Sequence, residues 1–519
     1  MLEELPAIDF PRPPFRGSVR LARDSKEGEF VEDKPLVVGE EYERLGGKKL
    51  SLIDVLAQSV GFMGPVFASA FVLPLMFGFG FSGRGAGTSS GLVVLLSAIG
   101  VFALAWIVSR YAKKIHAAGA LYDYVSQGLG HTIGAASGWM YYGGTIVLTT
   151  ALGVLLGGYV HDNLLPVVFG IEDPIFPIWV WDAILALGLF AVLFLGVQLS
   201  TRVQLTLALI SMAVVLIFAI TVIADLGGDN DFGKVFDPSP EGGFSGILFG
   251  VLYGVLAFVG FETAANLAEE TVDPKRSIPR AVLGAVLIVG VFYLILAYVE
   301  VAGFGFDLAV ILDPAVASAP LFALADPSSG FGSEFWLKTL LVVVFLDMLA
   351  VYVGAGVAST RGVFALARDR RLPRMAASVS RHGTPTGAIL LLIAIQALWI
   401  YLAEGNDTIF ALPDLPHYFS IFAWGAAFGA FAIVVVYFVL SVSGLVGLAK
   451  DQGYAGVVVA AFIGMVVSAG AMFGSFYEVP SPLWLASLYA LIWGLIGLVV
   501  MLVVRGRAPA SEALAELRE

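Results

Sequence analysis

Residues 251–280 read VLYGVLAFVGFETAANLAEETVDPKRSIPR, an apolar run followed by a charged segment with two prolines. The apolar part is long enough to cross a membrane, but Gly260 interrupts it and Glu262 places a carboxylate inside it. An ionisable side chain at membrane depth costs free energy, so it is expected to have a partner or a function. The glycine offers a point at which the helix can open. This pattern predicts an interrupted transmembrane helix that carries a functional site.

The composition places the whole chain in the membrane class. It has 519 residues, of which 58% are hydrophobic and only 13% are charged. A soluble core does not grow to this size without splitting into domains, whereas runs of about 20 apolar residues cross a bilayer as helices. The chain has no cysteine, and its five histidines lack the spacing of metal ligands. The sequence therefore predicts an all-α membrane protein without a metal centre or a cofactor.

Hydropathy predicts about 12 transmembrane helices of roughly 20 residues each. The expected spans are residues 51–78, 88–110, 132–160, 176–198, 202–225, 244–267, 279–304, 334–362, 386–403, 416–444, 455–475 and 483–504. Residues 1–50 are polar and acidic, and we expect a mostly irregular cytoplasmic tail there rather than a cleaved signal peptide.

Basic residues are concentrated in alternate loops, which predicts an orientation. The positive-inside rule then places both termini in the cytoplasm of a cell-membrane protein, with acidic loops on the other side. The net charge of −12 gives no sign of a nucleic-acid partner. The basic residues used are Lys48, Lys49, Arg110, Lys113, Lys114, Arg202, Lys275, Arg276, Arg280, Arg361, Arg368, Arg370, Arg371, Arg374, Arg381, Lys450, Arg505 and Arg507.

The first span contains a second interruption, GFMGP at residues 61–65, five spans before the one at Gly260. An odd offset gives the two halves opposite topology, and interrupted helices at matching positions of inverted halves indicate a transport site. Pro65 lacks an N–H group, so the helix loses a hydrogen bond there. Exposed N–H groups would attract a carboxylate, and free carbonyls an ammonium or a cation. A proline kink in a packed helix is the alternative.

Two carboxylates lie deep in predicted spans. Glu262 suits a proton carrier, a partner for a substrate amine, or a structural acceptor. Asp347, midway along the eighth span, suits a coupling role or a structural hydrogen bond to a neighbouring helix. Span three carries a polar, aromatic face that either lines a pocket or packs against another helix; it consists of Tyr141, Tyr142, Thr145 and Thr149.

Three motifs together resemble the amino acid–polyamine–organocation (APC) superfamily. Residues 258–263 (FVGFET), with 268–280 (AEETVDPKRSIPR), resemble its sixth-helix signature. Residues 114–125 (KIHAAGALYDYV) are similar to its segment between helices two and three. Residues 359–369 (STRGVFALARD), followed by Leu372-Pro373, are similar to its motif after helix eight.

The resemblance implies a LeuT-type 5+5 inverted repeat with broken helices 1 and 6. Residues 51–444 would form this core, 445–504 two additional helices, and 505–519 a cytoplasmic tail. It also implies transport of amino acids or related amines by alternating access. The substrate carboxylate would meet the first break and its amine the second. The implied substrate-binding residues are Gly61, Phe62, Met63, Gly64, Thr145, Thr149, Tyr253, Ala257, Phe258, Val259, Gly260 and Phe261.

The chain departs from the family pattern in helix five. Many proton-coupled members carry a lysine there, whereas this span has none and Ser211 is the nearest match. Coupling would then use a proton on Glu262 or Asp347, a sodium ion bound by Ser359 or Thr360 with carbonyls of the first helix, or exchange without an ion. A membrane sensor that keeps the pocket without completing a transport cycle is the competing hypothesis. A channel or an enzyme is disfavoured, because the polar groups cluster at mid-depth and no nucleophile motif is present.

Overall fold

The computed structural model describes residues 21–23, 30–32, 45, 49–77, 85–238, 243–313, 316, 319–406, 408–412, 415–448, 454–477, 479 and 481–504. The chain falls into two compact units, Met1–Glu43 and Arg44–Glu519. In the first unit, strands β1 (Leu21–Arg23) and β2 (Phe30–Glu32) pair antiparallel. The predicted tail at 505–519 lies outside the described residues, as do Lys48, Lys450, Arg505 and Arg507.

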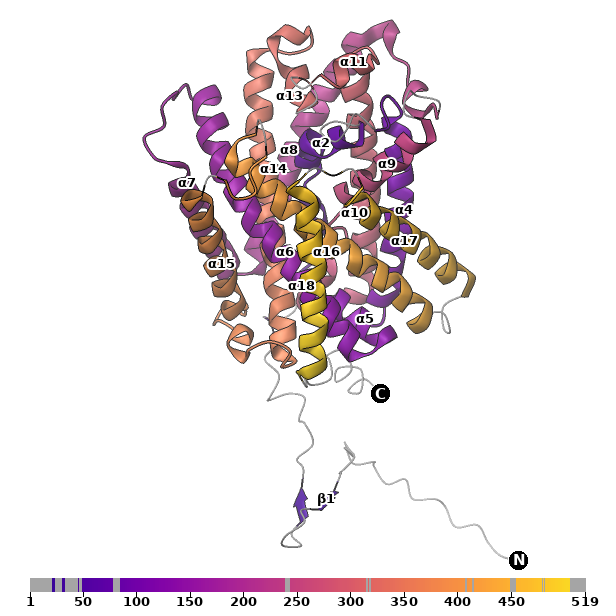
Figure 1. Cartoon of the computed structure of the whole chain (residues 1–519), viewed down its shortest axis with the longest axis vertical. Coiled ribbons are helices and arrows are strands. Elements are labelled where there is room, and N and C mark those ends of the chain that lie inside the picture. Colours follow the sequence, from indigo (N-terminus) through magenta and orange to yellow (C-terminus); the bar gives the residue numbers. More distant parts are fainter. Residues whose placement is uncertain are drawn as a thin grey trace, which may run out of the picture. The chain divides into compact units, whose positions relative to one another are not determined.

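The second unit is a bundle of helices (Figure 1). Eleven helices among the described residues are long and apolar enough to cross a membrane, and the shorter α9 occupies the place of the sixth predicted span. The spanning elements are α1 (Leu52–Met63) with α2 (Pro65–Phe71), α4 (Ser90–Ala112), α6 (His131–Tyr159), α7 (Ile178–Leu195), α8 (Val197–Leu226), α9 (Gly243–Ala257), α10 (Pro274–Ala302), α14 (Glu334–Arg368), α15 (Thr386–Gly405), α16 (His417–Gly447), α17 (Tyr454–Gly474) and α18 (Leu483–Val503).

Shorter elements connect these helices. They are α3 (Leu73–Phe77), α5 (Leu121–Leu129), α11 (Leu308–Ile311) and α13 (Pro320–Ala325), the π-helical η1 (Val160–Val168), and the 3₁₀ turns η2 (Gly227–Asp229), η3 (Lys234–Phe236), η4 (Thr263–Glu270), η5 (Pro327–Ser329) and η6 (Arg374–Ala377). The first helix begins with a capping box. Asp54 N–H donates to Ser51 Oγ, and Ser51 N–H donates to Asp54 Oδ2, which satisfies two backbone donors at the helix start.

Burial separates inner helices from outer ones. In an apolar 18-residue window, 78% of the residues are buried in α1–α2, in α6 and in α14. The corresponding share is only 22% in α7 and 28% in α15 and in α18. Figure 1 shows α7 beside α15 on one flank of the bundle. The inner helices therefore form the core of the bundle, and the outer ones present apolar side chains to lipid.

Small residues allow the inner helices to approach closely. A Cβ atom at Gly144 in α6 would lie 3.2 Å from the carbonyl oxygen of Gly429 in α16. A Cβ atom at Gly429 would lie 2.8 Å from the Gly144 carbonyl oxygen. Paired glycines are the usual means of close helix packing in lipid, where van der Waals contact replaces the hydrophobic drive.

Both predicted helix breaks are present. The first lies at Gly64, whose left-handed conformation (φ 57°, ψ 68°) separates α1 from α2. The second lies after Ala257, where α9 ends, and Gly260 adopts φ 110° before η4 begins. Only glycine adopts these dihedral angles without strain.

We expect Gly64→Ala to lower the free energy of unfolding by about 2–5 kcal/mol, because it adds left-handed strain to overpacking. The added Cβ would lie 2.2 Å from Cγ2 of Val351. Thermal unfolding of the purified protein in detergent measures the effect. Gly188→Ala in α7 is the matched control, since nothing lies within 4 Å of its Cβ position. Equal unfolding midpoints for the two variants would contradict this reading of the break.

Candidate functional site at the two helix breaks

The two breaks contact each other, although some 200 residues of chain separate them. A Cβ atom at Gly260 would lie 2.2 Å from Cδ1 of Phe62. Ser59 Oγ donates to the Phe261 carbonyl oxygen at 2.7 Å and accepts from Ala264 N–H at 3.1 Å. The broken parts of the first and sixth helices therefore form one buried site.

Asp347 from α14 caps the first break. Its Oδ2 accepts hydrogen bonds from the N–H groups of Val66, at 2.9 Å, and Phe67, at 2.8 Å. These are the donors that would otherwise close the helix onto the carbonyls of Phe62 and Met63. A carboxylate at a helix N-terminus is stabilised both by the N–H groups and by the helix dipole.

Glu262 is the corresponding carboxylate at the second break, and it is fully buried. Tyr141 from α6 donates its hydroxyl to Oε1, and Tyr437 from α16 donates to Oε2 at 2.7 Å. Glu262 thus ties the unwound segment to two neighbouring helices.

The carbonyls predicted to receive a substrate amine are partly used by the protein itself. Tyr293 in α10 donates its hydroxyl to the Ala257 carbonyl oxygen at 2.8 Å. Phe261 N–H donates to the Phe258 carbonyl, and the Thr263 hydroxyl donates to the Gly260 carbonyl at 2.7 Å. Among the described residues, the Val259 carbonyl has no such donor.

The predicted threonine and serine hydroxyls bond mainly within their own helices. Thr149 donates to the Thr145 carbonyl at 2.6 Å, and Ser359 and Thr360 each donate four residues back at 2.7 Å. The structure does bring Thr149 and Ser359 together, with 3.4 Å between their hydroxyl oxygens. A sodium site at Ser359 and Thr360 stays a prediction.

Ser211 joins α8 to α14. Its hydroxyl donates to the carbonyls of Leu207 and Val343, both at 2.8 Å.

Two buried glutamines that sequence reasoning missed lie at the first break. Gln204 in α8 donates to Gln58 Oε1 at 3.1 Å, and Gln58 donates to the Gly354 carbonyl oxygen at 2.9 Å. A Cβ atom at Gly61 would lie 3.0 Å from Gln204 Oε1. The sequence signal that could have identified them is an uncharged amide side chain inside an apolar span.

The predicted aromatic residues pack around the second break. Phe258 meets Tyr293 edge to face, with 5.1 Å between ring centroids, and Phe261 lies 5.3 Å from the ring of Tyr437. Tyr253 packs beside Phe249 one turn earlier in α9. These rings give the site apolar walls.

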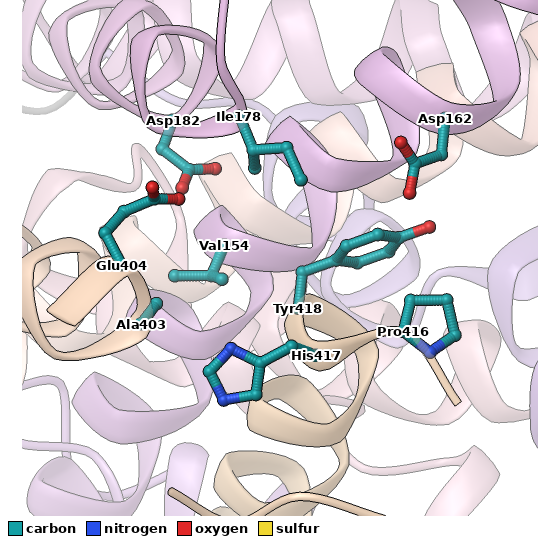
Figure 2. A pocket seen from close by; sticks show the side chains of 9 residues that line it. All are labelled: Val154, Asp162, Ile178, Asp182, Ala403, Glu404, Pro416, His417 and Tyr418. Carbon is teal, nitrogen blue, oxygen red and sulfur yellow. The ribbon is translucent and has the colours of Figure 1, made fainter. Parts of the chain in front are cut away.

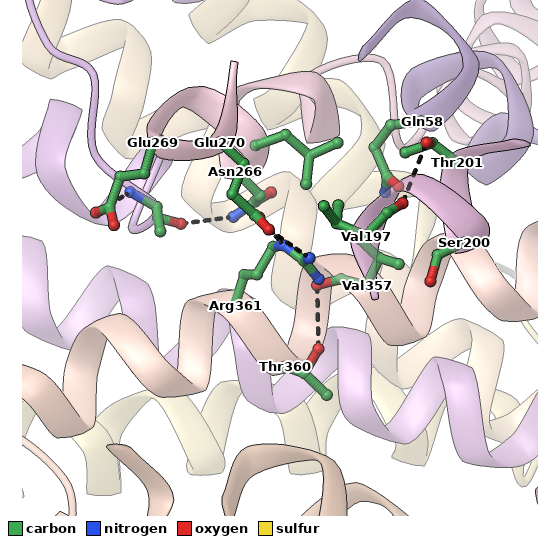
Figure 3. A network of polar contacts seen from close by, with 12 residues as sticks. Gln58, Val197, Ser200, Thr201, Asn266, Glu269, Glu270, Val357, Thr360 and Arg361 are labelled. Atoms are coloured by element: carbon green, nitrogen blue, oxygen red, sulfur yellow. Dashed lines mark hydrogen bonds and ion pairs between the residues drawn. The ribbon is translucent and has the colours of Figure 1, made fainter. Parts of the chain in front are cut away.

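Buried ion pairs close the bundle at the end where the sixth helix exits (Figure 3). Arg361 Nε donates to Glu270 Oε2 at 2.6 Å, and the two side chains are only 3% and 1% exposed. Arg368 makes a two-bond contact with Glu269, at 2.9 and 3.1 Å. We call Glu269, Glu270, Arg361 and Arg368 the ion-pair layer.

The ion-pair layer also holds backbone from two other segments. The N–H groups of Lys49 and Leu50, at the entrance to the first helix, donate to the Glu270 carbonyl oxygen at 2.8 and 3.0 Å. Ala118 N–H, between α4 and α5, donates to Glu269 Oε1 at 2.9 Å. Four parts of the chain are therefore joined at this end.

A cavity of about 340 Å³ lies apart from the breaks, between η1, α7, α15 and α16 (Figure 2). Figure 2 shows Asp182 and Glu404 facing each other across it. Asp182 is buried, and neither carboxylate oxygen has a hydrogen-bond partner among the described residues. None of the predicted site residues lines this cavity.

The fold and the site define a multi-pass membrane protein of the LeuT type. Crystal structures of variants of the manganese transporter from Eremococcus coleocola match it with a TM-score of 0.53. The match covers 89% of this chain and 97% of theirs at 13% sequence identity. The predicted all-α fold with broken helices 1 and 6 is confirmed.

The chain belongs to the amino acid permease family, whose model matches residues 66–450. An uncharacterized transporter of Mycobacterium tuberculosis is 26% identical over 78% of this chain and 81% of its own length. The branched-chain amino acid permease BcaP of Lactococcus lactis is 26% identical over 67% of this chain and 74% of its own length. The lysine-specific permease LysP of the same organism is 26% identical over 59% of this chain and 60% of its own length. The predicted resemblance to the APC superfamily is confirmed.

We expect Arg361→Met to lower the free energy of unfolding by about 3–5 kcal/mol, because it leaves the buried Glu270 carboxylate without its partner. Lys338→Met is the control, since Lys338 pairs with Glu334 at 2.6 Å where the side chains are 39% and 76% exposed. That change should cost about 0–1 kcal/mol. Unfolding in detergent measures both, and a similar loss in the two variants would refute the structural role of the ion-pair layer.

Proposed function

We propose that the protein is a secondary active transporter that moves an amino acid or a related amine across the cell membrane by alternating access. The substrate binds between the two helix breaks. The observation that carries the proposal is their direct contact, with Gly260 against Phe62 and a buried carboxylate on each break. Broken helices at inverted positions are the arrangement that transporters use to bind substrate at mid-membrane.

Two closures on opposite sides of the site support alternating access. On one side lies the ion-pair layer, where the sixth helix exits. On the other, aromatic rings from α2, α13 and α16 meet, with centroid separations of 5.6–6.2 Å; they are Phe67, Phe71, Phe322, Phe419 and Phe422. Release of one closure at a time would expose the site to one face of the membrane. The ion-pair layer faces the cytoplasm in the predicted orientation, as do both termini.

Transport is coupled through the same site in one of three ways. A proton moves on Glu262 or Asp347, a sodium ion binds near Ser359 and Thr360, or one substrate exchanges for another. Of the two carboxylates, Glu262 is held by two tyrosine hydroxyls, whereas Asp347 keeps one oxygen without a partner among the described residues. This difference favours Asp347 as the group that can take up a proton or a cation.

Uptake by purified protein in liposomes tests the transport proposal. Radiolabelled amino acids and amines are offered under a proton gradient, a sodium gradient, or with substrate inside. We expect uptake above that of empty liposomes in at least one condition. Glu262→Gln and Asp347→Asn should each reduce it about tenfold, because each removes the charge that strengthens the hydrogen bonds which the carboxylate accepts. Unchanged pH dependence in both variants would exclude a proton carrier, and binding without flux in every gradient would exclude transport.

The absence of cysteine allows a direct test of the closure. A single cysteine replacing Met63, which is buried at the first break, reports access to the site. We expect a membrane-impermeant thiol reagent to label it faster from the cytoplasmic side once Glu270→Gln weakens the pair with Arg361. Lys338→Met should leave the labelling rate unchanged. Equal rates with and without Glu270→Gln would contradict a gating role.

A further inference from the structure

Every backbone N–H group at the first break already has a protein partner. Gly64 N–H donates to the Val60 carbonyl oxygen at 3.2 Å, and Pro65 has no N–H group. Val66 and Phe67 donate to Asp347, and Ala68 donates to the Gly64 carbonyl oxygen at 2.8 Å. The five residues 64–68 therefore leave no backbone donor for a substrate carboxylate.

Most donors of the second break are used as well. Phe258, Val259, Phe261 and Thr263 donate within the local turns, each to the carbonyl three residues before it in the chain. Ala264 N–H donates to Ser59 Oγ, and Ala265 N–H donates to the Glu262 carbonyl oxygen.

What remains unsatisfied consists of acceptors. The carbonyls of Gly61, Phe62 and Met63 lose their helical donors, because Pro65 has none and the next two N–H groups bind Asp347. Asp347 is fully buried, and its Oδ1 has no hydrogen-bond partner among the described residues. A buried carboxylate oxygen without a donor is costly unless something binds it.

We propose that the substrate is an organic amine that lacks a carboxylate, and that its ammonium group binds Asp347 Oδ1 and the first-break carbonyls. Asp347 occupies the N–H groups that would otherwise receive the carboxylate of an α-amino acid. This inference rests on the proposed function and narrows its substrate class. Asp347 is thereby a specificity-determining residue.

An α-amino acid meets two obstacles in this site. Its carboxylate finds no backbone donor in residues 64–68, and it would lie near a second negative charge in a water-poor site. Burying the carboxylate of an amino acid without a partner costs more binding free energy than losing one favourable contact. Binding sites use such unpaired charges to reject ligands that resemble the correct one. The corresponding amine carries only a positive charge, which Asp347 Oδ1 and the carbonyl oxygens can bind.

The apolar surroundings of the breaks suit an organic cation. Aromatic side chains, among them Phe62, Phe258 and Phe261, surround the breaks and suit an alkyl or aryl group. Asp347 Oδ1 and the three carbonyls offer four acceptors, enough for all three donors of one primary ammonium.

Matched pairs of amino acids and their decarboxylated amines provide the test. Liposomes with the full-length protein are offered leucine or isoamylamine, phenylalanine or phenethylamine, and lysine or cadaverine. We expect the wild type to take up at least one amine at least about tenfold faster than its amino acid. Burying a carboxylate without a partner costs more free energy than the difference that corresponds to a tenfold change. Competition by each unlabelled compound gives its relative affinity.

Two variants at one position test the role of Asp347. Asp347→Asn keeps an oxygen for Val66 and Phe67 but removes the charge, and should reduce amine uptake about tenfold. Asp347→Ala frees both N–H groups, and should shift the ratio of amine to amino acid uptake toward the amino acid. Asp182→Asn removes a buried carboxylate in the separate cavity and should leave the ratio unchanged. Gel filtration and thermal unfolding verify that each variant is folded.

The outcomes distinguish this inference from the proposed function. Faster uptake of amino acids than of their amines by the wild type would overturn the inference and leave the transporter proposal intact. Full amine uptake by folded Asp347→Ala would overturn it as well. No uptake of any compound in any gradient would overturn the transporter proposal, and the inference with it.

Discussion

The structure depends on how backbone polar groups are satisfied inside the membrane. A helix that opens in lipid exposes N–H and C=O groups, and each one left alone costs several kcal/mol. Asp347 accepts from Val66 and Phe67 and so removes this cost for the donors of the first break. At the second break the backbone donors bind local carbonyls and Ser59 Oγ, and Glu262 fixes the segment to Tyr141 and Tyr437. Both breaks are therefore satisfied by groups of the protein itself.

The same carboxylates link the site to the helices that surround it. Asp347 belongs to α14, which also carries Arg361 and Arg368 of the ion-pair layer, about four and about six turns away. Glu262 leads directly into η4, which ends with Glu269 and Glu270. Continuous chain in α14 and in η4 therefore connects each break to the ion-pair layer. Under the proposed function, this continuity is the route by which substrate binding would reach the ion-pair layer.

Much of the fold was predictable from local sequence, and particular elements show why. The predicted span 334–362 corresponds to α14 (Glu334–Arg368), and the break predicted at residues 61–65 lies at Gly64. Apolar length, glycine and proline act locally, so they can be recognised without knowledge of distant residues. The motifs that resemble the APC superfamily indicated the family for the same reason.

The sequence by itself determined the spanning helices, the two breaks and the presence of carboxylates at mid-depth. Only the tertiary structure decided what those carboxylates bind. The partners of Asp347 lie 280 and 281 residues away, and Gln204 reaches Gln58 across 146 residues. Such pairs depend on how helices from different parts of the chain pack, and no local sequence pattern predicts that packing. The expectation of a carboxylate-binding first break arose from local geometry, whereas the packing of α14 fills that position from within the protein.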